Sequence, residues 1–225
     1  MRKLIQITLL SFILLSFTSC FEVREEVRMN ADGSGSVNLT IDLSQSKNNL
    51  TNYMKAGEVN GQKIPSQAEI EMELLKLKNV VSAIPGMTEV KLKKDFTEFV
   101  FNLTGNFKNV KTLNTAINTA SATMNRTPFP LKKVKHFNLS DNKFSRLFEY
   151  TDDRLTSAEY DGLPAIPRLL MESAKVISIY RFENPVKRVS NKNAKMSPSK
   201  KAVMLEANIA EFAKGEISLA NDISF

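Results

Sequence analysis

The fold is decided by the stretch FEVREEVRMNADGSGSVNLTIDL, residues 21–43. Its first part alternates between two faces, one made by Phe21, Val23, Glu25 and Val27 and the other by Glu22, Arg24, Glu26 and Arg28. After the turn sequence Asn30-Ala31-Asp32-Gly33-Ser34-Gly35, apolar residues again fall on every second position, at Val37, Leu39, Ile41 and Leu43. Two such runs around an Asp-Gly turn predict a β-hairpin.

The turn of this hairpin also has some features of a calcium loop. Asn30, Asp32, Ser34 and Gly35 match positions 1, 3, 5 and 6 of an EF-hand loop. Position 12 would be Ile41, where the loop needs a bidentate glutamate. The sequence therefore predicts no calcium site here.

Downstream of the hairpin, helical patterns alternate with further strand patterns. One helix is predicted to begin at Ser66, which forms a capping box with Glu69, and to end at Pro85-Gly86. Other helices are expected within 44–64, over 110–124 after Asn109, over 164–174 and after Asn208, and a polar loop is expected over 151–162. Strands are expected as hairpins over 90–103 and 134–150, and singly over 176–182, 202–207 and 217–225.

Repeated β-hairpins separated by helices predict an α+β fold, with helices packed on a mostly antiparallel sheet. Residues 20–225 are expected to form a single domain, since their number is ample for one hydrophobic core. The pattern also allows the first and last strands to share a sheet.

The N-terminus predicts export from the cytoplasm. Arg2 and Lys3 precede an apolar run from Leu4 to Phe17. Fourteen residues span only about 21 Å as a helix, which is shorter than the roughly 30 Å hydrocarbon core of a membrane. This length and these flanks are typical of a signal peptide.

Cys20 is the only cysteine of the chain and follows this apolar run. Phe17-Thr18-Ser19-Cys20 is similar to a bacterial lipobox, with phenylalanine where leucine is usual, whereas Phe17 is too large for the site at which soluble secreted proteins are cleaved. We therefore predict a lipoprotein signal peptide over 1–19 and a domain tethered through lipidated Cys20. The alternative is an ordinary buried free cysteine. Lipidation of the only thiol would leave none for disulfides or metal ligation.

Lipidation at Cys20 would attach the protein to the bacterial cell envelope, and we expect the outer membrane. One acyl chain binds a membrane only marginally, at about 0.8 kcal/mol for each buried methylene. A bacterial lipoprotein typically carries several chains, so the expected attachment is permanent. The membrane is therefore the first predicted partner of this chain.

A basic stretch, residues 187–201, accounts for most of the excess positive charge. The net charge of the whole chain is +7, and the stretch contains six basic residues and no acidic one: Lys187, Arg188, Lys192, Lys195, Lys200 and Lys201. Such a cluster is attracted to anionic surfaces, so a polyanionic partner is one interpretation and a solvated hairpin loop is the other. With no tryptophan and four tyrosines, the chain offers little for stacking on nucleic-acid bases, and no nucleic-acid partner is expected.

The sequence offers few residues for catalysis. His136 is the only histidine, so a zinc site or a Cys/His nucleophile pair is not expected, and no cofactor is predicted. Ser44-Gln45-Ser46-Lys47 and Ser140-Asp141-Asn142 match two penicillin-binding signatures, but the third, K-T-G, is missing. Glu69, Glu71 and Glu73 are interpreted as part of a solvated helix face.

Three segments carry a resemblance to known lipoproteins. They are the turn at 30–35 soon after Cys20, Arg181-Phe182-Glu183-Asn184-Pro185-Val186 followed by Ser190-Asn191, and the ending from Ile209 to Ile223. In these segments the chain resembles Bacteroidota-type lipoproteins and is distantly similar to the LppM-like lipoprotein domain. The resemblance implies an envelope lipoprotein with a small α+β domain, and it carries over no catalytic residue.

These observations lead to one functional hypothesis and two alternatives. We expect a lipid-anchored envelope lipoprotein that acts as a non-catalytic binding or assembly module for an envelope partner, and not as an enzyme. One alternative is a receptor for lipid or polyanion that uses the basic stretch. The other is a hydrolase with a carboxylate pair that the sequence does not reveal.

Overall fold

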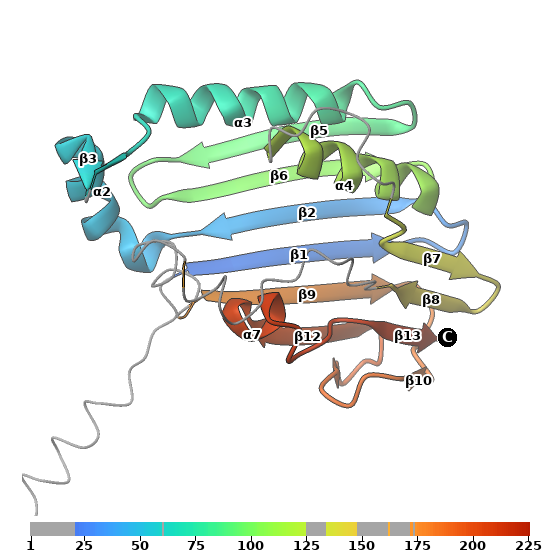
Figure 1. Ribbon diagram of the computed structural model, residues 1–225. Helices are drawn as coiled ribbons and strands as arrows, with labels where there is room; N and C mark the ends of the chain where they lie inside the picture. The colour runs from blue at the N-terminus through green and yellow to red at the C-terminus, as the bar shows by residue number, and fades with distance from the viewer. Residues whose placement is uncertain (1–20, 60, 125–133, 148–161, 163–171, 173) are drawn as a thin grey trace, which may run out of the picture.

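The computed structural model describes residues 21–59, 61–124, 134–147, 162, 172 and 174–225 (Figure 1). The predicted signal peptide, Cys20, and nearly all of the loop and helix expected over 151–174 lie outside these residues. The described chain is arranged around a seven-stranded sheet in the order β11-β12-β9-β1-β2-β6-β5. These strands are β1 (Phe21–Met29), β2 (Gly35–Asp42), β5 (Met87–Asp95), β6 (Val100–Phe107), β9 (Ala174–Phe182), β11 (Lys195–Met196) and β12 (Ala202–Asn208).

The hairpin predicted from residues 21–43 is confirmed. β1 and β2 pair in antiparallel register from Glu22↔Asp42 to Met29↔Gly35. Gly33 adopts a φ of +82°, a conformation that only glycine adopts at little cost. Gly35 is required for a different reason, because a Cβ at this position would lie 2.0 Å from the backbone oxygen of Arg28. The hairpin can therefore close tightly.

The other neighbour of β1 is β9, which comes much later in the sequence. The two strands run parallel, from Phe21↔Ala174 to Met29↔Phe182. The remaining strand pairs of the structure are antiparallel. The predicted α+β fold with a mostly antiparallel sheet is therefore confirmed.

A second sheet has four strands in the order β10-β13-β8-β7. They are β7 (Phe137–Ser140), β8 (Lys143–Arg146), β10 (Arg188–Val189) and β13 (Asn221–Ser224). The aromatic rings of Phe137 and Phe144 pack on Tyr180 of β9, with centroid distances of 6.0 and 5.4 Å. These contacts join the two sheets. The sequence pattern allowed the first and last strands to share a sheet, but β13 belongs to the second sheet. Both edges of β1 are occupied, one by β2 and the other by β9.

Two helices, α3 (Gln67–Ser82) and α4 (Val110–Met124), lie on one face of the large sheet, over β5 and β6 (Figure 1). The predicted capping box of α3 is present, since Ser66 and Glu69 each accept a backbone hydrogen bond from the other. Leu77 and Val81 of α3 and Leu113 and Ala116 of α4 are buried. The helices and the second sheet therefore cover the same face, on which Val27 and Tyr180 belong to the hydrophobic core.

The opposite face of the large sheet is polar. Arg181 of β9 forms an ion pair with Glu26 of β1, and Asn102 of β6 donates a hydrogen bond to Thr40 of β2 at 2.9 Å. An antiparallel sheet with one face packed and one face in water shows this alternation. The alternation of apolar and polar residues over 21–43 thus matches the packed face and the polar face of the whole sheet.

Smaller elements complete the described chain. They are a 3-10 turn (Ser44–Ser46), α2 (Lys47–Ala56), the short pair β3 (Glu58–Val59) and β4 (Gln62–Lys63), and α7 (Ile209–Ala213). The C-terminal strand covers only 221–224 of the predicted 217–225. Asn221 interrupts the apolar pattern because its side-chain oxygen is buried and accepts hydrogen bonds from the backbone of Ser190 and Asn191, both at 3.0 Å. Within the described chain, no helix combines the length and the apolar character that crossing a membrane requires.

Candidate ligand-binding site

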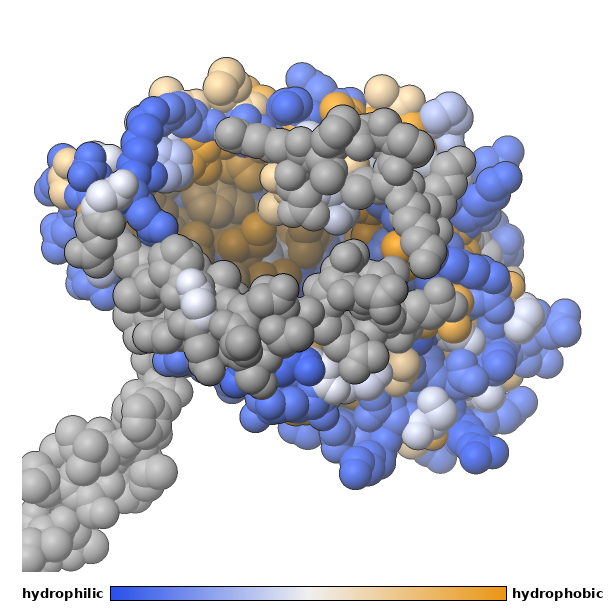
Figure 2. All heavy atoms as spheres, viewed as in Figure 1, coloured by the Kyte–Doolittle hydropathy of each residue, from blue (hydrophilic) through white to orange (hydrophobic). Residues whose placement is uncertain are grey.

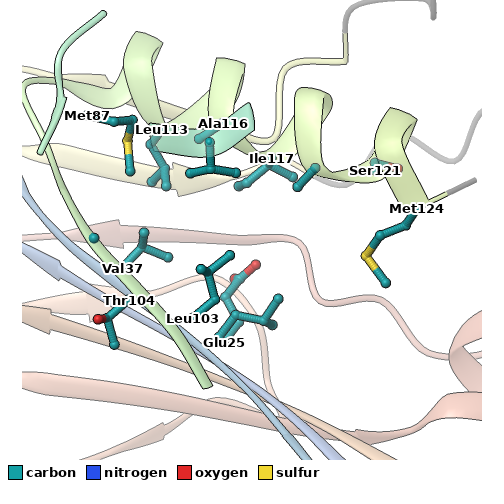
Figure 3. A pocket seen from close by; sticks show the side chains of 14 residues that line it. Glu25, Val37, Met87, Leu103, Thr104, Leu113, Ala116, Ile117, Ser121 and Met124 are labelled. Carbon is teal, nitrogen blue, oxygen red and sulfur yellow. The ribbon is translucent and has the colours of Figure 1, made fainter. Parts of the chain in front are cut away.

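An apolar cavity of about 380 Å³ lies between α4 and the covered face of the large sheet (Figure 3). Its floor comes from β1, β2 and β6, and its roof from α4. In Figure 3 the side chains of Leu113 and Ile117 point down from the helix, and those of Val37 and Leu103 point up from the strands. The lining is Glu25, Val37, Leu39, Val81, Met87, Leu103, Thr104, Gly105, Leu113, Ala116, Ile117, Ala120, Ser121 and Met124.

Small residues leave this space open. Ala116 and Ala120 lie one turn apart on α4, on the stripe that faces the sheet. Gly105 of β6 lies on the floor, where a Cβ would come within 3.0 Å of the Met87 side chain. Larger side chains at Ala116 and Ala120 would fill the space, as is usual in a close-packed interior, whereas the room beside Gly105 is taken by Met87 and Val90. The cavity is therefore built into the sequence of α4.

A second hollow, of about 600 Å³, adjoins the first beside the C-terminal end of α4. Met124 lines both hollows, and Ile70, Leu74 and Leu77 of α3 line the second. Figure 2 shows a recessed hydrophobic surface on this side of the molecule, with hydrophilic residues along part of its edge. When Figures 1 and 2 are compared, the recess lies beneath the first half of α3, on the side of the view from which β1 starts. It is therefore on the side of the domain where β1 begins, at Phe21.

A buried ion pair lies at the floor of the cavity. Glu25 Oε2 is 3.6 Å from Arg146 Nη2, and the side chains are 18% and 8% exposed. The hydroxyl of Tyr180 donates a hydrogen bond to Glu25 Oε1 at 3.1 Å. Arg146 also donates to the backbone oxygen of His136 and lies over the ring of Phe137, 4.7 Å from its centroid. Side chains from β8 of the second sheet and β9 of the large sheet therefore meet at the carboxylate of Glu25 on β1.

The surroundings fix the charge states of this cluster. Burial, and then the charge of Glu25, raise the pKa of Tyr180 far above its usual range, so the phenol remains a hydrogen-bond donor. Burial works to lower the pKa of Arg146, but the Glu25 carboxylate and the Tyr180 side chain together outweigh it, and the pKa is raised. Burial and the charge of Arg146 lower the pKa of His136 to about 4, so its imidazole is neutral at neutral pH.

The basic stretch lies elsewhere. All six of its basic residues are exposed, and none forms an ion pair with another residue that the structure describes. The stretch is not a hairpin of its own, because its β10 pairs with β13 and its β11 pairs with β12. It follows β9, whose last residue is level with Met29, the last residue of β1. The stretch therefore leaves the sheet at the end opposite Phe21, and its Lys195 returns to the middle, level with Glu26.

Two of the acidic residues singled out on α3 have basic partners. Glu69 binds Lys63 and the N-terminus of α3, while Glu71 pairs with Lys94 of β5. Among the described residues no three metal-ligating side chains come together. Sequence reasoning missed the cluster of Glu25, Arg146 and Tyr180. The one available signal was a glutamate on the apolar face of the first strand.

Comparisons with known proteins give one structural match. No family model matches the chain, and no curated protein matches it. Among solved structures, the chain is similar to the NMR structure of the folded domain of the Mycobacterium tuberculosis protein LppM. The match covers 92% of this chain and 89% of that chain, with a TM-score of 0.38 and 8% sequence identity. The sequence bears a distant resemblance to the same lipoprotein domain.

Proposed function

We propose that this protein is a lipid-anchored, non-catalytic binding module of the bacterial cell envelope, and that its cavity holds one apolar ligand. The cavity itself is the observation that carries the proposal. Its volume of about 380 Å³ falls within the range of about 300–1,000 Å³ that is usual for small-molecule sites. Its lining is mostly aliphatic, with a few polar groups, which is the composition of such sites.

An apolar ligand would also complete the packing of the domain. Protein interiors have few voids larger than a water molecule, and an unfilled apolar void lowers stability. Water gains little in such a space because it needs several polar partners, whereas apolar molecules enter it readily. Ala116 and Ala120 keep the space open where larger apolar residues would close it.

The position of the cavity fits supply from a membrane. Cys20 directly precedes Phe21, so a lipid on Cys20 would be attached where β1 begins. The recess opens beneath the first half of α3, on the side of the view from which β1 starts (Figures 1 and 2). An anchored domain would therefore hold the entrance close to the bilayer, from which an acyl chain or a similar molecule can pass into the cavity.

The carboxylates favour binding over hydrolysis. Glycoside hydrolysis, for example, uses two carboxyl groups that face one bond. Glu25 is the only carboxylate among the described residues that line the cavity. Its oxygens face Tyr180 and Arg146. This arrangement supports the non-catalytic proposal over the alternative of a hydrolase with a carboxylate pair.

The basic stretch supports a second candidate function, the binding of a polyanion. Its six charges are exposed. The stretch follows Phe182, which is level with Met29 and about 26 Å along β1 from Phe21, while Lys195 lies nearer, level with Glu26. A polyanion bound there would lie away from the anchoring membrane. Neutralising all six residues should abolish salt-sensitive binding to a soluble polyanion such as dextran sulfate, and unchanged binding would contradict this candidate.

Photo-crosslinking tests the proposed ligand site. The full chain is purified in neutral detergent and irradiated with an alkyl probe that carries a diazirine. We expect cross-links in peptides from β2, β6 and α4. Ala120→Phe, which fills the cavity, should reduce them about tenfold, while Ala68→Phe on the exposed start of α3 should leave them unchanged. Equal labelling of the two variants would contradict the proposal.

A further inference from the structure

The one charged side chain among the described residues that line the cavity, Glu25, is a hydrogen-bond acceptor. Glu25 is among the lining residues, whereas Arg146 and Tyr180 are not. Figure 3 shows the Glu25 side chain reaching from β1 toward the space beneath α4. Arg146 lies on the other side of the carboxylate, over the ring of Phe137. A molecule in the cavity would therefore meet the carboxylate before it meets the guanidinium.

This carboxylate has capacity for another donor. Its two oxygens offer about four acceptor positions. Tyr180 donates to Oε1, and Arg146 lies beside Oε2. In a site that excludes water, a further hydrogen bond to a charged acceptor is strong. A second anion placed there would be repelled, and the low effective dielectric would increase this repulsion.

We infer that the cavity selects an apolar ligand whose inner end donates a hydrogen bond to Glu25, as a long-chain alcohol does, over one that ends in a carboxylate. The inference rests on the proposed function and names the ligand class for the same site. Glu25 is then the residue that determines specificity. The apolar walls supply affinity for the chain, and the carboxylate discriminates between end groups.

Three photoreactive probes with the same alkyl chain test this inference. One ends in a hydroxyl, one in the methyl ether of that hydroxyl, which accepts but does not donate, and one in a carboxylate. With the full wild-type chain in neutral detergent at neutral pH, the alcohol should label cavity peptides about tenfold more than the carboxylate. The ether should fall between them. Glu25→Gln should remove the discrimination against the carboxylate, whereas Glu26→Gln on the polar face should preserve it.

The outcomes separate this inference from the proposed function. Equal labelling of the cavity by all three probes, or stronger labelling by the carboxylate, overturns the inference and leaves apolar binding in place. Labelling of the cavity by none of them overturns the proposed function and the inference with it. If circular dichroism shows that Glu25→Gln is unfolded, the wild-type comparison of alcohol, ether and carboxylate decides alone.

Discussion

The guanidinium of Arg146 lies 3.6 Å from the carboxylate of Glu25 and joins the second sheet to the centre of the first. Both side chains are largely buried. Each charge has therefore lost much of its hydration, and the other charge compensates for it. The same pair holds the two sheets together and places one carboxylate in the cavity.

Removal of one partner from this pair should be costly. Arg146→Met leaves Glu25 without its cation, and we expect unfolding free energy to fall by about 3–5 kcal/mol. Arg181→Met is the matched control, because Arg181 pairs with Glu26 on the exposed face, where such a pair contributes about 0–1 kcal/mol. Urea unfolding of the full chain, followed by circular dichroism, measures both. Equal losses would show that the Glu25–Arg146 pair has no special structural role.

Acid should weaken the fold through His136. Its pKa is lowered to about 4 from an ordinary value of 6.5, and its Nε2 is buried without a hydrogen-bond partner among the described residues. Between these two values the unfolded chain binds a proton that the folded chain does not, so stability falls as the pH drops from 6.5 toward 4. Because the ring is partly exposed, we expect a loss of about 1–2 kcal/mol.

His136→Asn tests the origin of this loss. The variant lacks the titrating ring, so the part of the acid destabilisation between pH 7 and pH 5 that belongs to His136 should disappear. Unfolding free energies of wild type and variant are compared at pH 7, 6 and 5. A difference between the two proteins that stays constant with pH would rule out His136 as the cause.

The tight hairpin should depend on Gly35. A methyl group at this position would lie 2.0 Å from the Arg28 oxygen, so Gly35→Ala should separate β1 from β2 and cost about 3 kcal/mol. At Gly57 a Cβ meets nothing within 4 Å, and Gly57→Ala should cost about 1 kcal/mol through its positive φ alone. Thermal unfolding of the two variants provides the comparison. A milder effect at Gly35 than at Gly57 would contradict the assigned contact.

The lipid anchor should depend on Cys20. Because Cys20 is the only cysteine, Cys20→Ala should abolish incorporation of a clickable fatty acid into the chain. Phe17→Leu, which brings the sequence closer to the usual lipobox, should retain it. In-gel fluorescence of labelled bacteria reads out both variants. Fatty-acid labelling that persists in Cys20→Ala would exclude this residue as the anchor.

Local features of the fold were predictable from the sequence. The hairpin over 21–43, the capping box of Ser66 and Glu69, and the N-cap at Asn208, whose side chain accepts from Ala210 and Glu211, all depend on residues close together in the chain. The parallel pairing of β1 with β9 was not predictable, because no local pattern determines which distant strand occupies a sheet edge. The same reason explains the separate sheet that contains β13.

The candidate site was visible only in part. Strand alternation placed Glu25 on the apolar face of β1, but its partners come from β8 and β9, far along the chain. Ala120 fits an ordinary helical stripe with Leu113, Ile117 and Met124, and the space that its small side chain leaves depends on the strands opposite. The volume of a cavity depends on how side chains from several distant elements pack together, and a local sequence pattern does not contain this information.

Native mass spectrometry of the full chain, released from neutral detergent after extraction from bacterial membranes, tests the central claim most directly. The account predicts one non-covalent adduct of a membrane-derived apolar molecule. This adduct should be lost under denaturing conditions, absent from Ala120→Phe and retained in Ala68→Phe. A wild-type protein that carries no adduct, or an adduct that persists unchanged in Ala120→Phe, would contradict a ligand-binding cavity between α4 and the sheet.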